Sequence, residues 1–404
     1  MANLLEVQGT VIPIGTIIQA VGPPDSSWVK CDGSILLKAD YQGYVINCED
    51  LHPLMWKNWY FVDVDQSTTG TTKYAISRMN SNIIACVGAG NTVWVSDDGG
   101  VTWSTNTGLT ANTHYVLTNN NTVFVTADYN TSTAYHSTDG ITWTSASLPF
   151  SGLWRYASYC SSAGKFILMT NSHTYSYAYS SDGSTWNTGT APFYHERVRF
   201  LTNDGSKFIV FSYYQSDPYE YLVHTSTDGI NWSSGTVDFL FGSPSFNYLT
   251  PTGMFYLNGE YYMPYLYSNN DNWCLKYVGS DIKDPDDWVR FLIQPSGNAD
   301  YFNCTNMIYT GNHIIGINSS TSEDGLLVGK TMTNLNFYRT QFYGMIGIVN
   351  DGENYAVILP TTNGWHSVVR STGVNYDTST HFQLPLLGIV NDYSRVYHYI
   401  KISE

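Results

Sequence analysis

The sequence predicts an all-β protein, most of which forms a seven-bladed β-propeller that is inserted into a smaller β domain. Three observations favour this fold class. A short turn motif recurs down most of the chain, apolar stretches of strand length precede its copies, and no segment shows helical periodicity. The composition agrees: 43% of the residues are hydrophobic, which is enough for a core, and only 13% are charged. The abundant Tyr and Trp (33 and 12 residues) fit β-structure with a polar, weakly charged surface.

The recurring motif is a serine and an aspartate followed by a glycine and a tryptophan. Its copies are residues 137–143, 180–186 and 226–232, and residues 96–103 repeat it with one extra residue. These residue types predict a tight turn in which the aspartate accepts backbone hydrogen bonds, the serine adds a local bond and the glycine adopts positive φ. The tryptophan is expected to fill an apolar gap beneath the hairpin. The residues expected to have this structural role are Ser96, Asp98, Trp103, Asp139, Trp143, Asp182, Trp186, Asp228 and Trp232.

This motif resembles the Asp-box (Ser-x-Asp-x-Gly-x-x-Trp), the repeat of β-propellers such as the sialidases and many carbohydrate-active proteins. Residues 96–103 have its full spacing, and the other three copies are one residue shorter between Asp and Gly. The resemblance implies that each turn joins the third and fourth strands of a blade. It also implies that the turns lie on the face opposite the one that usually binds ligands.

Degenerate copies extend the repeat through residues 280–288, 331–337 and 371–376. The anchor aromatics of all copies are 39 to 56 residues apart, which is the length of one four-stranded blade. They are Trp103, Trp143, Trp186, Trp232, Trp288, Phe337 and Tyr376. Seven anchors predict seven blades within residues 51–376, and a strand within residues 55–64 is expected to help close the ring.

The two ends of the chain do not fit the repeat. Residues 11–50 contain Pro-x-Gly-Thr-Ile, then Pro-Pro-x-x-x-Trp-x-x-Cys-Asp-Gly-Ser, then Asp-Tyr, and this order resembles the tail collar domain of bacteriophage tail fibres. That family continues to a Phe-x-Leu-Pro element and a closing strand, which here occur only at residues 382–385 and 396–402. The resemblance implies a collar-like domain split into residues 1–50 and 377–404, with the propeller of residues 51–376 inserted. A closed ring brings its own ends together, as such an insertion requires.

Charge and motif content exclude several function classes. The net charge of −15 disfavours binding to nucleic acid or to anionic lipid. No stretch is apolar and long enough for a membrane span, and the N-terminus lacks the pattern of a secretory signal. The six scattered cysteines are expected to be reduced core residues. The dispersed histidines match no metal-site spacing, so neither a metal nor a cofactor is expected.

Catalysis is not expected either. A sialidase would need the Arg-Ile-Pro segment of its family, which is absent. Another glycosidase would need two carboxylates about 5–10 Å apart across a cleft. The loop carboxylates Asp217, Glu220, Asp271, Glu323 and Asp324 could supply such a pair only if the fold brought two of them together. The interpretation is therefore that the protein is not an enzyme and that these are solvated loop residues.

Ligand binding is the favoured chemistry. Loops between second and third strands, with the connections between blades, should form one face that is rich in aromatic residues. Aromatic rings stack on the apolar faces of sugars, and neighbouring polar groups bind the hydroxyls. The candidate ligand-binding residues are Tyr129, Trp154, His173, Tyr175, Tyr194, His195, Tyr219 and Trp273.

Together, the collar resemblance and the aromatic face imply a phage tail-fibre protein of the virion, synthesised in the host bacterial cytoplasm. Its expected function is attachment to a bacterial surface glycan, with many copies per virion turning weak sites into strong attachment. One alternative is a depolymerase that cleaves the same glycan. Another is a structural tail or baseplate component whose partners are other phage tail proteins. Relatives of the collar family are commonly trimers, which makes a homo-oligomer possible.

Overall fold

The computed structural model divides the chain into two compact units, Met1–Asn58 with Thr372–Glu404, and Trp59–Ser371. The residues that it describes are 17–20, 28–30, 35–37, 59–63, 73–80, 82–170, 176–191, 197–214, 220–237, 250–266, 272–293, 304–309, 314–318, 325–329, 331–339, 345–350, 356–360, 367–371, 381–383 and 397–401. Among these residues no helix is long and apolar enough to cross a membrane.

The first unit joins the two ends of the chain in shared sheets. Strand β34 (Tyr397–Lys401) lies between β1 (Ile17–Ala20) and β2 (Trp28–Lys30) and is antiparallel to both. Strand β3 (Ile35–Leu37) pairs with β33 (His381–Gln383). Segments from the beginning and the end of the sequence therefore build this unit together.

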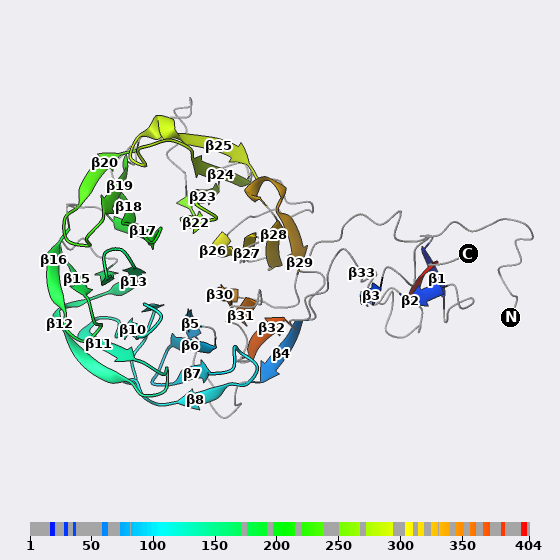
Figure 1. Cartoon of the computed structure of the whole chain (residues 1–404), viewed down its shortest axis with the longest axis horizontal. Helices are drawn as coiled ribbons and strands as arrows, with labels where there is room; N and C mark the ends of the chain where they lie inside the picture. Colours follow the sequence, from blue (N-terminus) through cyan, green and yellow to red (C-terminus); the bar gives the residue numbers. More distant parts are fainter. Residues whose placement is uncertain are drawn as a thin grey trace, which may run out of the picture. The chain divides into compact units, whose positions relative to one another are not determined.

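The second unit is a β-propeller, so the prediction of an all-β propeller is confirmed (Figure 1). The described strands of this unit form seven antiparallel sheets. The first four are β5–β8 (Lys73–Met79, Ile83–Gly88, Val93–Ser96, Ser104–Asn106), β9–β12 (Leu117–Asn119, Phe124–Ala127, Thr131–Ser137, Thr144–Gly152), β13–β16 (Trp154–Cys160, Lys165–Thr170, Ser176–Ser180, Asn187–Thr190) and β17–β20 (Arg197–Asn203, Phe208–Tyr214, Glu220–Ser226, Ser233–Thr236). The others are β21–β25 (Thr250–Pro251, Phe255–Leu257, Glu260–Leu266, Asn272–Tyr277, Trp288–Leu292), β26–β29 (Cys304–Tyr309, Ile314–Asn318, Gly325–Gly329, Asn336–Arg339), and β30–β32 with β4 (Met345–Asn350, Ala356–Pro360, Ser367–Ser371, Trp59–Asp63).

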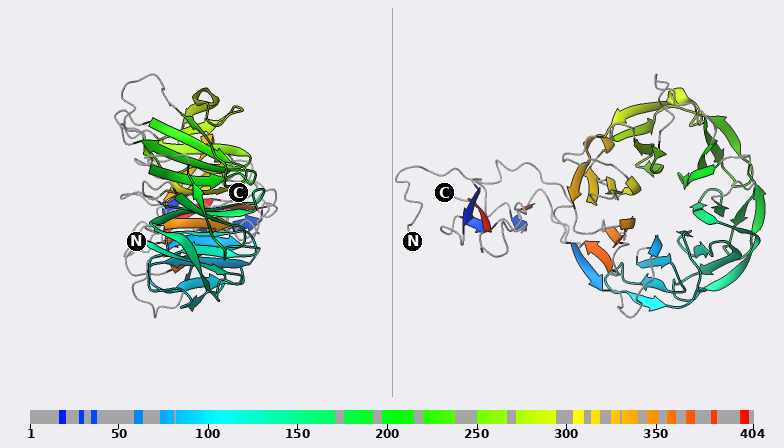
Figure 2. Two further views of the ribbon diagram at one scale, coloured as in Figure 1. Left: turned by 90° about the vertical axis from the view of Figure 1, so that its left-hand side faces the viewer. Right: turned by 180° about the vertical axis from the view of Figure 1, so that it is seen from behind.

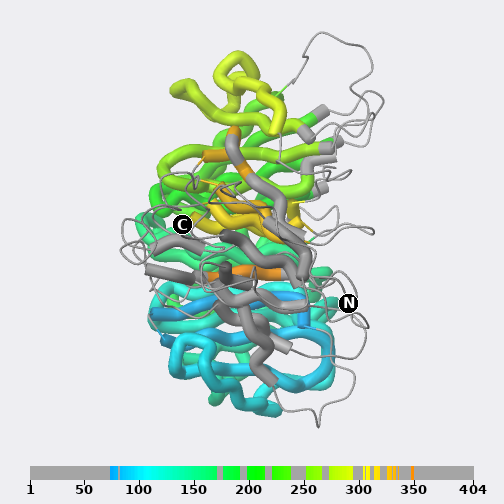
Figure 3. The backbone as a smooth tube through the Cα atoms, turned by 90° about the vertical axis from the view of Figure 1, so that its right-hand side faces the viewer, coloured from blue at the N-terminus to red at the C-terminus, as the bar shows by residue number. Residues whose placement is uncertain are grey.

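The sheets are arranged in a ring, with the first strand of each sheet nearest the centre (Figures 1 and 2). Seen edge-on in Figure 3, the strands run across the thickness of the ring. The ring closes where β4 pairs with β32, with Phe61 opposite Val369. The segment that the sequence indicated as a closing strand therefore joins the last sheet.

The core of the ring lies between neighbouring sheets. One cluster combines Val125 of β10 with Trp154 of β13 and Leu168 of β14, all fully buried. Because the middle strands are covered on both faces, they read as continuous apolar runs without alternation, as in β14. The four described cysteines (Cys86, Cys160, Cys274 and Cys304) are free and buried in this packing.

A tight turn joins the third and fourth strands in each of four successive sheets, formed by residues 96–103, 137–143, 180–186 and 226–232. We call these the serine–aspartate turns. In the second of them, Asp139 Oδ1 accepts hydrogen bonds from the Ser137 hydroxyl (2.9 Å) and from the N–H groups of Ile141 and Thr142 (2.8 and 2.7 Å). Gly140 has φ +74°, and its N–H donates to the Ser137 hydroxyl (2.8 Å). The side chains of the turn thus accept hydrogen bonds from the backbone N–H groups of the same turn.

The tryptophans of these turns pack beneath them. Trp143 and Trp186 are buried, and the Nε1 of each donates to the carbonyl of its turn glycine, at 2.8 and 3.0 Å. Trp232 differs, because its Nε1 donates to the Tyr177 hydroxyl, which itself donates to the Gly229 carbonyl. Each ring therefore fastens its own turn to the sheet below.

The degenerate copy that precedes β25 uses other groups for the same purpose. Asp287 of the 3-10 helix η3 (Pro285–Asp287) accepts hydrogen bonds from the N–H groups of Ser280 and Asp281, both at 2.8 Å. Trp288 is buried and donates to the Ile282 carbonyl. The anchor at Tyr376 lies outside the described residues.

The carboxylates of the serine–aspartate turns are expected to make the fold acid-sensitive. Slight burial acts to raise the pKa of Asp182 and of Asp228. Hydrogen bonds from the N–H groups two and three residues later outweigh this effect and hold both pKa values below the usual range. A carboxylate with a depressed folded-state pKa stabilises the protein above its unfolded pKa, about 3.9, and this stability is lost as the pH falls through the folded value.

We expect Asp182→Asn to lower Tm at pH 7 and to change it much less at pH 2. Thermal melts followed by circular dichroism check this, with Asp97→Asn, an exposed carboxylate within the first turn, as the control. Equal Tm losses at both pH values would contradict it.

Candidate ligand-binding surface

Five of the innermost strands of the ring have a β-bulge close to their first residue. The register shifts between Lys73 and Ala75 in β5, between Trp154 and Tyr156 in β13, and between Val198 and Phe200 in β17. Similar shifts occur in β26 and β30. A bulge leaves one residue out of the hydrogen-bonded ladder and turns its side chain away from the regular direction. The residues at the first three bulges are Tyr74, Arg155 and Arg199.

These bulges lie on one face of the ring. Lys73 pairs with Gly88, the last residue of β6, and Trp154 pairs with Thr170, the last residue of β14. The connection from the second to the third strand begins at those points. We call this side the loop face. The serine–aspartate turns follow the third strands and therefore lie on the other face.

Four half-buried side chains meet on the loop face. The Tyr74 and Tyr115 rings are 4.6 Å apart between centroids, and the Tyr115 and Tyr129 rings are 5.0 Å apart. The guanidinium carbon of Arg155 lies 3.5 Å from the Tyr115 centroid and 4.8 Å from that of Tyr129. This tyrosine–arginine cluster (Tyr74, Tyr115, Tyr129 and Arg155) spans the sheets β5–β8, β9–β12 and β13–β16. Stacked rings and a cation form a surface suited to the apolar faces and hydroxyls of a sugar.

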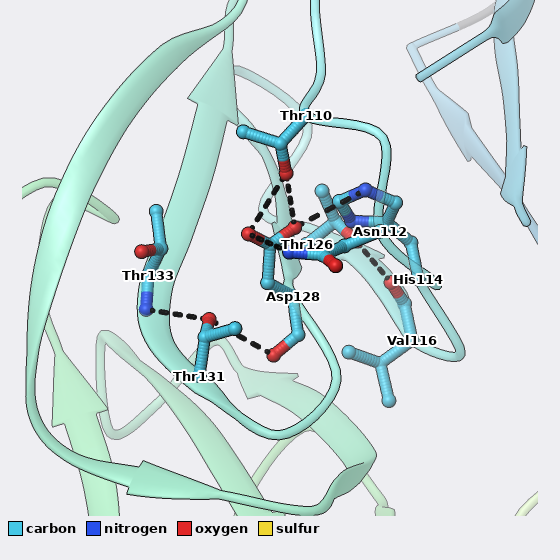
Figure 4. Close-up of polar contacts among 8 residues, drawn as sticks. All are labelled: Thr110, Asn112, His114, Val116, Thr126, Asp128, Thr131 and Thr133. Atoms are coloured by element: carbon cyan, nitrogen blue, oxygen red, sulfur yellow. Dashed lines mark hydrogen bonds and ion pairs between the residues drawn. The ribbon is translucent and has the colours of Figure 1, made fainter. Parts of the chain in front are cut away.

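A buried polar cluster supports two of these tyrosines (Figure 4). The Asp128 carboxylate accepts hydrogen bonds from the Thr110 hydroxyl (2.9 Å to each oxygen) and from Asn112 Nδ2 (3.2 Å), and His114 Nε2 lies 3.3 Å from its Oδ1. Asp128 and His114 are both almost completely buried. Because Tyr129 follows Asp128 and Tyr115 follows His114, this cluster fixes the residues that precede the two rings.

Backbone hydrogen bonds complete the support. The His114 N–H donates to the Gly88 carbonyl (2.9 Å), and the Tyr129 N–H donates to the Thr113 carbonyl (2.8 Å). Burial lowers the pKa of His114, although the nearby Asp128 charge acts to raise it. Burial therefore favours the neutral form of the imidazole.

Lys73, the residue before Tyr74, does not contribute its charge to the surface. It is buried, its ammonium donates to the Thr92 carbonyl (2.6 Å), and it lies 4.9 Å from the centre of the Trp94 ring. Burial lowers the pKa of Lys73 to about 8. Lys73 therefore anchors the start of β5 while the neighbouring Tyr74 reaches the loop face.

The structure brings only one of the sequence-predicted ligand residues, Tyr129, into this cluster. The prediction for Trp154 is wrong, because the ring is fully buried and its Nε1 donates to the Thr131 carbonyl (2.8 Å), so no face is free to stack on a ligand. Trp273 is half-buried on β24, a third strand and not a loop, with the Arg290 guanidinium 4.1 Å from its ring. The other predicted ligand residues lie outside the described residues: His173, Tyr175, Tyr194, His195 and Tyr219.

The loop carboxylates considered for catalysis are not placed either. Asp217, Asp271, Glu323 and Asp324 lie outside the described residues, and Glu220 begins strand β19. In the part of the chain that the structure describes, no group of three or more His, Cys, Asp and Glu side chains could hold a metal ion.

Sequence reasoning missed Tyr74 and Tyr115 and gave Arg155 no binding role. A signal for them exists in the repeat itself. Each follows the buried residue that opens an innermost segment, 28 to 31 residues before the anchor tryptophan of its sheet. Aligning the repeats backwards from those anchors would have placed these three residues, and Arg199 close to them, at one structural position.

Comparison with known proteins supports the fold alone. No protein-family model matches the chain, and no curated protein matches it. Among solved structures, YCF48 bound to D1 peptide is 16% identical, with a TM-score of 0.57, and the match covers 82% of this chain and 99% of that one. YCF48 from Cyanidioschyzon merolae is 11% identical, with a TM-score of 0.56 and coverage of 77% and 98%. Virginiamycin B lyase from Staphylococcus aureus is also 11% identical, with a TM-score of 0.53 and coverage of 78% and 99%. Since the neighbours include an enzyme, the fold is compatible with both binding and catalysis.

Proposed function

We propose that this protein attaches non-covalently to a bacterial surface glycan through the loop face of its propeller. The observation that carries the proposal is the tyrosine–arginine cluster, which places three half-exposed tyrosine rings beside a guanidinium. Tyrosine rings offer apolar faces to sugar rings, and guanidinium N–H groups donate to sugar oxygens. Such contacts are weak singly and become strong when many copies act together.

The place of the protein in a phage tail rests on the resemblance of its two ends to the tail collar domain. It is supported by the pairing of β34 with β1 and β2 and by the division into two compact units. In this proposal residues 1–50 and 377–404 form a collar-like domain, and residues 51–376 form an inserted seven-bladed Asp-box propeller in which each sheet is one blade. The protein would be made in the host cytoplasm and would contact other tail proteins in the virion.

The test is binding of the purified, fluorescently labelled protein to candidate host cells before and after periodate oxidation of their surface sugars. Binding that periodate abolishes would support a glycan receptor. Binding that survives periodate would point to a protein receptor. No binding to any candidate host would favour the structural alternative, in which the propeller docks another tail protein.

Replacing Tyr129 with alanine is expected to weaken cell binding about three- to tenfold, because one aromatic surface of the cluster is lost. Tm should change little, since the side chain is only half-buried. Tyr256→Ala is the matched control, because Tyr256 is 37% exposed on β22 in another sheet. Binding curves on cells, measured beside thermal melts, check both variants. Equal binding losses in the two variants would argue against the cluster.

A depolymerase is the second candidate, because a lyase shares the fold. Asp128, which precedes Tyr129 in the sequence, is buried and bound to Thr110 and Asn112, so it is not placed to exchange protons with a ligand. We therefore propose binding without cleavage. Release of reducing sugars from host polysaccharide would favour the enzyme instead.

A further inference from the structure

Two arginines occupy equivalent positions on neighbouring innermost strands. Arg155 lies at the bulge of β13, and Arg199 lies at the bulge of β17. The two strands are joined directly at this level, because the Tyr156 hydroxyl donates to the Val198 carbonyl (2.8 Å). Tyr156 follows Arg155 and Val198 precedes Arg199, so both guanidinium side chains leave the ring from adjacent points on the loop face.

Neither arginine has an ion pair or hydrogen bond to its guanidinium within the described residues. Each lies against a tyrosine ring instead, with its guanidinium carbon 3.5 Å from the Tyr115 centroid for Arg155 and 5.1 Å from the Tyr213 centroid for Arg199. The Nε of Arg199 is buried without a hydrogen-bond partner. A buried donor left unsatisfied costs on the order of 1–3 kcal/mol.

Both charges act on the same hydroxyl. Burial raises the pKa of Tyr156 to about 12, and the Arg199 and Arg155 guanidinium groups both oppose that rise. Two cations within electrostatic range of one group also repel each other, and an anion placed between them would relieve the repulsion. The surroundings of this pair therefore favour an acidic ligand group.

The close approach of Arg155 to the face of Tyr115 leaves its guanidinium group able to bind such a group. A guanidinium that stacks by its face on a ring keeps its N–H groups directed outward in its own plane. That planar fork matches a carboxylate or phosphate through two parallel hydrogen bonds. Tyr129 lies beside the Arg155 guanidinium, and Tyr74 packs against Tyr115, so the rings offer a surface for the rest of a sugar.

We infer that the ligand of the loop face is an acidic saccharide, whose oxyanion is bound jointly by Arg155 and Arg199 while its ring packs against the tyrosines. This inference rests on the proposed glycan-binding function and adds the class of glycan. The oxyanion is a carboxylate, as in a uronic acid, or a phosphate ester, and both present the same paired oxygens to the arginines.

Two matched probe pairs test the inference by isothermal titration on the full-length protein. Trigalacturonate is compared with its methyl ester, and glucose 6-phosphate is compared with glucose. We expect one charged probe to bind at least about tenfold more tightly than its neutral counterpart, the scale of a charge-assisted hydrogen bond. The pair that shows the difference identifies the oxyanion as carboxylate or phosphate.

Arg155→Gln and Arg199→Gln should each remove most of this preference, measured within each variant as the ratio of the affinity for the charged probe to that for its neutral counterpart. Arg155→Lys, which keeps the charge but not the fork, should restore only part of it. Arg290→Gln, an exposed arginine on β25 beside Trp273, is the matched control and should leave the preference intact. Near-ultraviolet circular dichroism confirms that each variant is folded.

Two results would overturn the inference. One is equal binding of charged and neutral probes, or no binding of either charged probe, by protein that still binds cells in a periodate-sensitive way. The other is a charge preference that persists in the Arg155→Gln/Arg199→Gln double variant. Both results are compatible with the proposed attachment to a glycan. Failure of that proposed function would appear instead in the cell-binding assay.

Discussion

Replacing Trp154 with alanine is expected to lower the free energy of unfolding by about 4 kcal/mol, the usual cost of deleting a buried tryptophan side chain. The ring is fully buried between the sheets β9–β12 and β13–β16, and its centroid lies 5.1 Å from that of Phe150. The ring also packs directly against Gly152. The Thr131 carbonyl, which accepts from Trp154 Nε1, would also lose its partner. Urea unfolding followed by tryptophan fluorescence and circular dichroism measures the change.

The Trp154 variant separates a packing role from a binding role. Trp154→Phe keeps most of the apolar contact and should recover more than half of the lost stability. Protein that is still folded at low temperature should bind cells almost normally, because the ring does not reach the loop face. A Trp154→Ala protein with unchanged stability but lost binding would contradict the buried placement.

Replacing Asp128 with alanine is expected to cost about 3 kcal/mol, because it removes a buried acceptor that contacts the buried His114 and the exposed Thr110 and Asn112. Thr110, Asn112 and His114 would all lose their partner. Cell binding should fall as well, since the backbone that carries Tyr115 and Tyr129 loses its support. Chemical unfolding and cell binding measured on the same preparation check both expectations.

Two further variants make this result specific. Asp286→Ala removes an exposed carboxylate on η3 and should leave stability and binding unchanged. The double variant His114→Ala/Asp128→Ala should cost less than the sum of the single changes, because the two side chains are in contact. Simple additivity would show that the two side chains do not interact.

The sheets of the propeller could be predicted because the chemistry of the serine–aspartate turns is local. Four residue types at fixed spacing determine the hydrogen bonds of Asp139 and the positive φ of Gly140, whatever the rest of the chain does. The recurring tryptophans then give the repeat length. Strand β4 also agreed with the expectation of a closing strand within residues 55–64, because an apolar segment precedes the first repeat; its partner β32 was not predicted.

The binding surface was harder to predict, because it depends on register. In strands buried on both faces, alternation does not reveal whether Trp154 or Arg155 reaches the surface. The bulge between Trp154 and Tyr156 decides this, and a bulge is a property of two paired strands. The sequence indicated Trp154, the aromatic residue at the start of its sheet. The residue that reaches the surface is its neighbour Arg155. Likewise, nothing local links Asp128 to Thr110, which the fold brings together.

The pairing of β4 with β32 has a consequence for how the ring is made on the ribosome. Strand β4 is synthesised first, and its partner Ser367–Ser371 emerges only after the other sheets. Sheets built from consecutive segments can form as they appear, since their contacts are close in sequence. The last sheet must wait for a contact between distant segments, which carries the largest loop-closure entropy of the ring. Until then β4, the fourth strand of the last sheet, has no partner strand. Nascent chains that stall before residue 371 would therefore expose this unpaired strand to chaperones, proteases or a neighbouring copy.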